Sequence, residues 1–254
     1  MAGRLDGRVA LVSGAGQGLG SAIARRLAGE GARVAVNDRA PSAKVDAVVA
    51  DTGGIPAIAD VSDPDAVERM VTHVDAQFGG IDILVANHAY MTMCPFEEHE
   101  PGDWWRNIDV NLSGTFFLIR AALPFIRRRG GGRVVIIASE FGVVGWANAT
   151  AYAASKAGLI SLTKTLGREL APEGILVNAI APGIMDTPQL DVDADDAGVS
   201  PAEIRRRYAA DSPIGRIGRP EEIAAVVAFL ASGAGGAFVG QIVQPNGGTT
   251  RALA

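Results

Sequence analysis

Seven short apolar runs separated by helical patterns most constrain how this 254-residue chain can fold. The runs are dominated by Val, Ile, Leu and Ala, as in strands that are buried on both faces. Strands that alternate with helices form a parallel sheet with helices on both sides. The sequence therefore predicts one doubly wound α/β domain over residues 1–254, with strands near 9–13, 33–37, 55–59, 82–86, 133–138, 175–181 and 239–244.

A glycine-rich turn, residues 13–20 (SGAGQGLG), follows the first strand and precedes a helical pattern. Glycines in such a turn permit a tight bend and a close approach to a pyrophosphate, which the amides and dipole of the helix N-terminus then stabilise. The second strand ends at Asp38, about twenty residues further on, where an acid can bind both ribose hydroxyls of NAD. An ordinary turn residue is the alternative interpretation of Asp38. The pattern predicts a dinucleotide site.

Tyr152 and Lys156 lie four residues apart in a helical segment, which puts both side chains on one face. A phenol titrates near ~10 unperturbed, and a cation one turn away lowers that pKa toward the working range. Ser139 directly follows a buried strand, at the sheet edge where open α/β folds bind ligands. A Tyr-x-x-x-Lys pair alone is common on amphipathic helices. Beside a nucleotide site, it predicts proton transfer to or from an oxygen.

The motifs of this chain, taken in sequence order, resemble those of the short-chain dehydrogenase/reductase family over essentially the whole chain. The glycine turn matches the family's TGxxxGxG, with Ser13 in place of threonine. The resemblance implies a single-domain Rossmann-type fold and an NAD(P)-dependent oxidoreductase. The other matching segments are the adenine-contacting pair Asp60-Val61, the catalytic set Asn111, Ser139, Tyr152 and Lys156, the nicotinamide loop Pro182-Gly183 with Thr187, and residues 215–223, which lead into a late helix.

The resemblance also implies a role for each member of the catalytic set. Tyr152 is expected to be the general acid in reduction and the general base in oxidation. Lys156 is expected to lower the pKa of Tyr152 and to hydrogen-bond the nicotinamide ribose. Ser139 is expected to hold the substrate oxygen where negative charge develops, and Asn111 to hold a water that connects Lys156 to solvent.

The cofactor preference depends on Asp38 and Arg39. A carboxylate accepts hydrogen bonds from a free 2′-hydroxyl and repels a 2′-phosphate, which favours NAD over NADP. The guanidinium directly after it could instead pair with that phosphate. The resemblance places the cofactor against Gly14, Gln17, Gly18, Leu19, Gly20, Asp38, Arg39, Asp60, Val61, Asn87, His88, Ala89, Tyr152, Lys156, Pro182, Gly183, Ile184 and Thr187.

The segment after the fourth strand departs from the family. Where the family usually has Asn-Asn-Ala-Gly, this chain has Ala86-Asn87-His88-Ala89. His88 is interpreted either as a hydrogen-bonded structural side chain or as a polar contact to the ribose or the substrate. Residues 244–248 (QPNGG) also replace the usual Val-Asp-Gly-Gly type of ending, which bears on subunit contacts more than on chemistry.

The substrate pocket is the least specified part of the site. Its candidate walls are mostly apolar, which favours a ring or a medium-length secondary alcohol or ketone, although each residue could equally belong to the core. The aspartate-rich segment 186–212 resembles the family's mobile substrate lid, with a solvated acidic loop as the alternative; both can hold. The candidates are Tyr90, Met91, Met93, Glu140, Phe141, Val144, Trp146, Ile184, Met185 and Leu190, with Glu140 as the one polar candidate for substrate selection.

Three functions remain compatible with these motifs. We favour an NAD-dependent alcohol dehydrogenase or ketoreductase. Asp38 and the acidic charge balance disfavour an NADPH-dependent 3-oxoacyl reductase of carrier-bound chains, because an acidic carrier seeks a basic patch. A nucleotide sensor of the same fold has no need of the complete catalytic set, although fold alone does not exclude it. The resemblance further predicts a homotetramer joined through the helices near 103–128 and 150–171.

Composition limits the remaining possibilities. The net charge of −5, from 23 basic and 28 acidic residues, argues against nucleic-acid partners. No apolar run approaches the ~20 residues that span a bilayer, and the N-terminus lacks a signal-peptide pattern, so no membrane partner is expected. A single cysteine, Cys94, forms no intrachain disulfide and suits the cytoplasm. Because the three histidines are scattered, no metal site is predicted.

Overall fold

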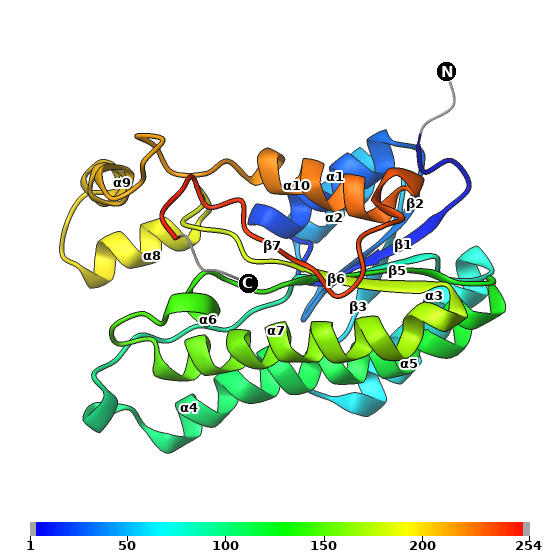
Figure 1. The fold of residues 1–254 in the computed structure, drawn as a ribbon, viewed down its shortest axis with the longest axis horizontal. Helices are drawn as coiled ribbons and strands as arrows, with labels where there is room; N and C mark the ends of the chain where they lie inside the picture. The colour runs from blue at the N-terminus through cyan, green and yellow to red at the C-terminus, as the bar shows by residue number, and fades with distance from the viewer. Residues whose placement is uncertain (1–3, 251–254) are drawn as a thin grey trace.

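The computed structural model describes residues 4–250 and contains a seven-stranded sheet whose neighbouring strands are all parallel (Figure 1). The strand order is β3-β2-β1-β4-β5-β6-β7, so the direction of winding reverses between β1 and β4. Open α/β sheets bind ligands at the carboxyl ends of the strands beside such a reversal. The strands are β1 (Val9–Val12), β2 (Arg33–Asp38), β3 (Ile55–Ile58), β4 (Ile83–Ala86), β5 (Gly132–Ile137), β6 (Ile175–Ile180) and β7 (Ile242–Val243).

The predicted strands are confirmed to within one residue at each end, except at β7. The sequence predicts a strand over 239–244, whereas β7 comprises Ile242–Val243 alone. Gly240 has φ of +65°, a left-handed conformation that does not continue a strand. Its amide donates to the carbonyl of Val177, and the regular ladder with β6 begins two residues later.

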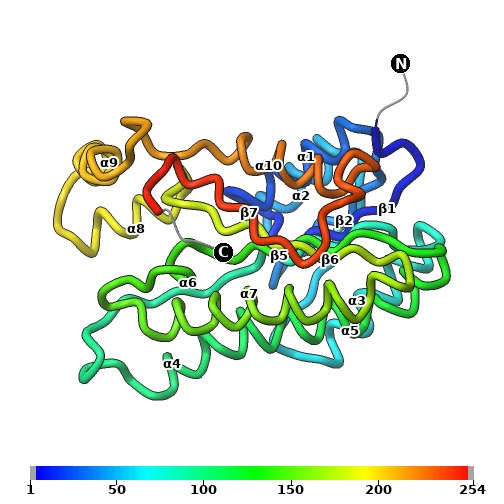
Figure 2. Tube along the Cα trace, viewed as in Figure 1, coloured from blue at the N-terminus to red at the C-terminus, as the bar shows by residue number. Residues whose placement is uncertain are grey.

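Helices cover both faces of the sheet, as predicted. The helices α1, α2 and α10 pack on one face, and α3, α5 and α7 pack on the other (Figures 1 and 2). The sequence sets their ends locally. At α3, for example, the Asp63 carboxylate accepts the amides of Asp65 and Ala66 at the start, and Gly79 ends the helix in a left-handed conformation. The bounds are α1 (Gly18–Gly29), α2 (Ala43–Thr52), α3 (Pro64–Phe78), α4 (Pro101–Ile108), α5 (Gly114–Arg128), α6 (Phe141–Val144), α7 (Thr150–Leu170), α8 (Gln189–Asp196), α9 (Pro201–Ala210) and α10 (Pro220–Ala231).

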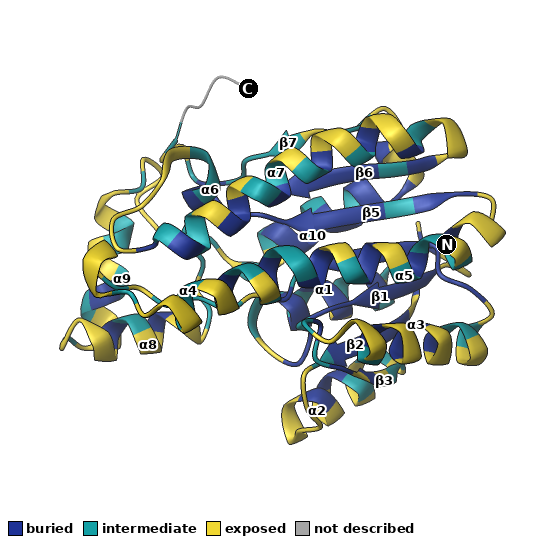
Figure 3. Cartoon of the chain, turned by 90° about the horizontal axis from the view of Figure 1, so that it is seen from below, coloured by how far each residue is buried: buried dark blue, intermediate teal, exposed yellow. Residues whose placement is uncertain are grey.

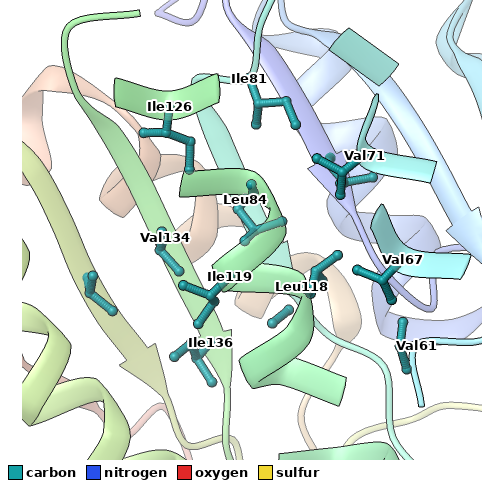
Figure 4. Packing of buried hydrophobic residues seen from close by; sticks show 14 of the residues in the cluster. Val61, Val67, Val71, Ile81, Leu84, Leu118, Ile119, Ile126, Val134 and Ile136 are labelled. Atoms are coloured by element: carbon teal, nitrogen blue, oxygen red, sulfur yellow. The ribbon is translucent and has the colours of Figure 1, made fainter. Parts of the chain in front are cut away.

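The larger hydrophobic core lies between the sheet and the α3–α5–α7 layer. Leu118 and Ile126 of α5 are fully buried over Leu84 of β4 and over Val134 and Ile136 of β5 (Figure 4). Each such side chain contributes roughly 1.5–3 kcal/mol when it is removed from water. The alternate strand residues face the second layer, so the sheet is buried on both sides, as its continuous apolar runs predict.

One continuous helical run consists of α4, a π-helical turn at Asp109–Ser113 (η2) and α5. Among the described residues, this run (Pro101–Arg128) is the one helix long and apolar enough to cross a membrane by length and composition. Its inner side packs on the core, and its outer side carries exposed residues (Figure 3). That amphipathic pattern is typical of a helix that covers the core of a globular domain.

Residues 186–212 are not an irregular loop, because they fold as the helices α8 and α9. A small cluster of buried apolar side chains, including Leu190 and Ile204, joins the two helices. The pair projects beyond the carboxyl ends of the strands, at the left of Figure 1. The acidic composition hides this periodicity, because the few apolar residues are enough to pair two short helices.

Candidate functional site

The glycine turn between β1 and α1 closes against the segment that follows β4. Gly14 and Gly18 have φ of +59° and +54°, which favour glycine. A Cβ at Gly20 would overlap the carbonyl oxygen of Gly14 and lie 2.5 Å from Asn87 Nδ2. Asn87 Nδ2 donates to the carbonyls of Ser13 and Gly14, both at 3.0 Å. The turn thus has the bare, closely packed backbone that a pyrophosphate site needs.

Asp38 ends β2 beside the same turn. A Cβ at Gly16 would overlap Asp38 Oδ2, so the carboxylate lies directly over the glycine backbone. The amide of Arg39 donates to Asp38 Oδ1 at 2.7 Å, which orients the carboxyl group. Nearby, Lys44 Nζ donates to Gln17 Oε1 at 2.6 Å. Asp38 therefore faces the predicted nucleotide cleft, although two cationic side chains, Arg39 and Lys44, lie on neighbouring segments.

Asp60 and Val61 follow β3 on the same side of the cleft. The amide and the hydroxyl of Ser62 donate to Asp60 Oδ1 at 2.9 and 2.6 Å. Burial raises the pKa of Asp60, but these hydrogen bonds outweigh burial and leave it below its usual range. The carboxylate is thus charged and held in place at neutral pH.

Ser139, Tyr152 and Lys156 converge from β5 and α7. Ser139 follows the last strand residue by two positions, and its Oγ accepts the amide of Phe141 at 3.1 Å. The helical spacing puts Lys156 beside Tyr152, with Nζ 5.4 Å from the ring centroid. Lys156 is 1% exposed, and its Nζ donates to the carbonyl of Ile137 at 2.8 Å.

The pKa values in this group differ from the expectation that Lys156 depresses Tyr152. Burial raises the pKa of Tyr152 to about 12, and a hydrogen bond with Ser139 offsets part of that rise. Burial also lowers the pKa of Lys156 to about 7. At neutral pH the phenol is therefore protonated, while the ammonium form of Lys156 is only partly populated.

Asn111 lies in the π-helical turn η2, a type of irregularity frequent at functional sites. Its side chain is fully buried and makes three hydrogen bonds. Oδ1 accepts the amide of Tyr90 at 2.7 Å, while Nδ2 donates to the carbonyl of Tyr90 at 2.9 Å and to Ser155 Oγ at 3.0 Å. Asn111 thereby links the segment after β4 to Ser155 of α7, the residue that directly precedes Lys156.

A single cavity of about 1070 Å³ brings most of the predicted residues together. All the predicted cofactor residues line it, from the glycine turn through Asp38, Asp60 and Asn87 to the loop at Pro182 and Gly183. Asn111 lies just behind the wall. The predicted catalytic and substrate residues that line it are Ser139, Tyr152, Lys156, Tyr90, Met91, Met93, Phe141, Ile184, Met185 and Leu190.

Glu140, Val144 and Trp146, which are predicted as substrate contacts, do not line this cavity. The chain turns after β5, and Glu140 Oε2 instead accepts the hydroxyl of Thr249 at 2.7 Å. Burial raises the pKa of Glu140, and the bond from Thr249 partly opposes this. Trp146 stacks outside the cavity on Phe141, with ring centroids 4.5 Å apart. It acts on the cavity only through Phe141.

The His88 side chain is buried, and its ring contacts hydroxyl groups of the glycine turn and of α5. Nδ1 lies 2.7 Å from Ser13 Oγ, and Nε2 lies 3.3 Å from Thr115 Oγ1. Burial, followed by the charge of Lys156, lowers the pKa of His88 to about 3. Both ring nitrogens therefore have partners within the protein.

The polar residues that line the cavity but were not predicted from sequence include Arg106, Asp109, Asp193 and Tyr208. The Arg106 guanidinium stacks over the Tyr90 ring at 4.4 Å, and Tyr208 Oη donates to Asp193 Oδ2 at 3.4 Å. Arg106 and Asp109 are three residues apart and therefore share a helix face with each other, but neither has a spacing that puts it on one face with Asn111. Nothing local marks Asp193 or Tyr208, because α8 and α9 bring them to the cavity. Within the described ranges, no group of three or more His, Cys, Asp or Glu side chains could hold a metal ion.

The comparisons with known proteins agree with this geometry. A family model described as enoyl-(acyl carrier protein) reductase matches residues 14–250. A cis-4-hydroxycyclohexanecarboxylate dehydrogenase of Sinomonas cyclohexanicum is 40% identical over 247 residues, which are 96% of each chain. A 3-oxoacyl-(acyl-carrier-protein) reductase of Thermotoga maritima is 36% identical over 250 residues, or 96% of this chain and 98% of its own. The corresponding reductase of Staphylococcus aureus strain Mu50 is 38% identical over 244 residues, or 94% and 96%.

Proposed function

The chain belongs to the short-chain dehydrogenase/reductase family, and we propose that it transfers a hydride between NAD(H) and a secondary alcohol or ketone. The observation that carries the proposal is the convergence of Ser139, Tyr152 and Lys156 on the cavity that the glycine turn also lines. One cavity thus offers both a nucleotide cleft and proton-transfer groups, which an oxidoreductase needs together.

The residues present fit a nicotinamide dinucleotide. At Gly16 and Gly20 a Cβ would overlap Asp38 or Gly14, so the bare backbone leaves room for a pyrophosphate along the turn. Asp38 and Asp60 offer acceptors for ribose hydroxyls and adenine, and the loop at Pro182 lines the far end. When bound, the dinucleotide supplies or accepts the hydride.

Side chains of the protein then transfer the proton. Tyr152 Oη donates a proton to the substrate oxygen during reduction and accepts it during oxidation. The Ser139 hydroxyl hydrogen-bonds the same oxygen where charge develops. Lys156 stabilises the phenolate by its charge, and Asn111 holds the turn through which protons are replenished.

We propose NAD over NADP as the cofactor. The Asp38 carboxylate lies over Gly16, where it would accept a free 2′-hydroxyl and repel a 2′-phosphate. The positive charges of Arg39 and Lys44 oppose this preference. The carboxylate decides in our proposal because its Oδ1 is already oriented by the Arg39 amide.

The substrate we propose is a ring-bearing or medium-length secondary alcohol. The substrate end of the cavity is lined by thioethers and aromatic rings, including Met91, Met185 and Phe141, and one relative's name specifies a hydroxylated cyclohexane ring. A carrier-linked 3-oxoacyl substrate is the second candidate, because several relatives carry that name. The segment 186–212 would act as a lid over either substrate.

We further propose a cytoplasmic homotetramer joined through α4–α5 and α7. The outer side of this layer exposes the large apolar side chains Trp105 and Phe116, which a partner subunit would cover. Light scattering of the purified protein should give four times the chain mass of 26.2 kDa. A monomer at micromolar concentration would contradict this assembly.

The test is turnover by the purified protein. NADH and NADPH oxidation would be followed with cyclic, aromatic and aliphatic ketones, including 4-oxocyclohexanecarboxylate, and with an acetoacetyl thioester. Faster turnover with NADH and a cyclic ketone supports the proposal, whereas NADPH with the thioester supports the second candidate. Tyr152→Phe should lower kcat by ~10²–10⁴-fold and leave NADH affinity nearly unchanged. Turnover near that of the unaltered protein would refute the role of Tyr152.

A further inference from the structure

A chain of hydrogen bonds runs from the glycine turn to the π-helical turn at Asn111, with His88 as its middle member. His88 is 8% exposed and is bonded through both ring nitrogens, to Ser13 Oγ at 2.7 Å and to Thr115 Oγ1 at 3.3 Å. Thr115 Oγ1 in turn donates to the carbonyl of Asn111 at 2.7 Å. This series of hydrogen bonds therefore links the glycine turn to the turn at Asn111, and the two turns lie at different parts of the cavity.

The partners of Ser13 fix the proton on the His88 ring. Ser13 Oγ accepts the amides of Asn87 and His88 at 3.0 and 3.3 Å, which occupy its two lone pairs. Its one proton goes to His88 Nδ1, since the alternative acceptor, the carbonyl of Val85, is farther away at 3.3 Å. A neutral His88 then carries its proton on Nε2 and donates it to Thr115.

Every bond in this chain consequently points the same way, from Ser13 through His88 and Thr115 to the carbonyl of Asn111. Aligned hydrogen bonds polarise and strengthen one another. Burial and the positive charge of Lys156 both lower the pKa of His88, and together they outweigh the backbone hydrogen bond with Val110 and the charge of Asp60, which raise it, so the ring stays neutral at neutral pH. A protonated ring would have two donors and would break the alignment at Ser13.

The surrounding glycines leave room for the ring between the two segments. A Cβ at Gly14 would lie 2.9 Å from His88 Cα, and a Cβ at Gly114 would lie 3.3 Å from Nε2. Alanine, the usual residue of the family at this position, has no group that could make either ring bond. The link is thus a property of this chain's own sequence.

We propose that His88 is a positioning residue that couples the nucleotide turn at Ser13 to the catalytic turn at Asn111. Ordering of the glycine turn by a nucleotide is transmitted through the ring and Thr115 to the backbone of Asn111, next to the Lys156 helix. The expected effect of His88 on kcat rests on the proposed function. Its expected effect on nucleotide affinity, the binding half of the inference, requires only that the protein binds NADH.

Two amide substitutions separate the halves of the link. His88→Asn puts an acceptor near the Nδ1 position and keeps the bond from Ser13, whereas His88→Gln puts a donor near the Nε2 position and keeps the bond to Thr115. His88→Ala removes both. His73→Gln, on the exposed side of α3, is the matched control for the glutamine change. NADH affinity would be measured by fluorescence titration, with kcat and KM for the best substrate.

His88→Ala should weaken NADH binding about tenfold and lower kcat about tenfold, with little change in substrate KM, as loss of two buried hydrogen bonds implies. His88→Asn should recover NADH binding more than kcat, and His88→Gln should recover kcat more than NADH binding. Combined with Thr115→Val, His88→Ala should add little further loss of kcat, because both act on one link.

Equal effects of the asparagine and glutamine variants on both parameters would overturn the proposal, as would a purely thermal destabilisation with unchanged affinity and kcat. ¹⁵N spectra of the unaltered protein should show an Nε2–H ring that does not titrate from pH 5 to 9. An Nδ1–H ring, or one that titrates near ~6.5, would also overturn it. The spectra and NADH titrations need no substrate, so they decide the binding half even if the proposed activity fails.

Discussion

Replacing Lys156 with methionine removes the one cation beside Tyr152 and leaves the side chain nearly the same length. Nζ lies 5.4 Å from the centroid of the Tyr152 ring. At that separation and an effective dielectric constant of about 20, two unit charges interact by ~3 kcal/mol, or ~2 pKa units. The Lys156→Met variant should therefore raise the apparent pKa for alcohol oxidation by about two units and slow oxidation at neutral pH by about 100-fold.

The same change should stabilise the fold. Burial lowers the pKa of Lys156 from 10.5 to about 7. A folded-state pKa below the unfolded value means that the unfolded chain binds more protons, so stability is lost as the pH falls from about 10.5 to 7. This shift costs at most ~5 kcal/mol at pH 7. Methionine escapes that cost, but it leaves the carbonyl of Ile137 without its 2.8 Å donor, at ~1–3 kcal/mol. A net gain of ~2 kcal/mol is expected at pH 7, with little or no gain at pH 10.

The assays are pH–rate profiles for alcohol oxidation and urea unfolding at pH 7 and pH 10. Lys164→Met, on the exposed side of the same helix, is the matched control and should change neither result. An unchanged apparent pKa in Lys156→Met, with measurable turnover, would refute the electrostatic coupling. A variant less stable than the unaltered protein at pH 7 would refute the claim that burial of the lysine opposes folding.

Three further predictions follow from contacts outside the catalytic group. Asp38→Ala should shift the NADH-over-NADPH preference in kcat/KM by at least about tenfold toward NADPH, and an unchanged ratio would remove the basis for proposing NAD. Gly20→Ala should weaken NADH binding by about tenfold or more, since its Cβ would overlap the Gly14 carbonyl; calorimetric affinity equal to that of the unaltered protein would contradict this. Asp82→Asn should cost ~2 kcal/mol in urea unfolding at pH 7. Burial raises the pKa of Asp82, but hydrogen bonds from Arg129, Val9 and Arg8 lower it by more, so the net pKa lies below the usual value. The stability that this carboxylate contributes is therefore present above about pH 4 and lost below it. A variant as stable as the original at pH 7 would count against that ion-paired site.

The sheet and the nucleotide turn could be predicted from sequence because local patterns determine them. The central strands, such as β1 and β4, are continuous apolar runs buried on both faces, and such strands need no distant partner to be recognised. The glycine turn is similar, since residues 13–20 must bend tightly wherever the helix that follows packs. Tyr152 and Lys156 share a helix face by spacing alone, so their proximity also follows from sequence.

The helices α8 and α9 could not be predicted in the same way. Residues 186–212 carry so many aspartates that the chain suggests a solvated loop, yet Leu190 and Ile204 suffice to pair α8 with α9. That pairing depends on contacts between the two helices and not on the average composition of the segment. Asp193 and Tyr208 reach the cavity only as a result of this fold.

Two residues close to the ends of strands show that position in the sequence alone does not predict where a side chain points. Glu140 directly follows Ser139, but its carboxyl group turns to Thr249, 109 residues away along the chain. His88 follows Asn87 into the cleft, but its ring turns inward to Ser13 and Thr115. A strand's carboxyl end fixes where a residue lies, while the side chain points to whatever partner the neighbouring elements supply. In a doubly wound sheet those partners come from other βα units. For this reason the positions of the motif residues could be predicted from backbone pattern and spacing. The directions in which the polar side chains between them point could be seen only in the folded structure.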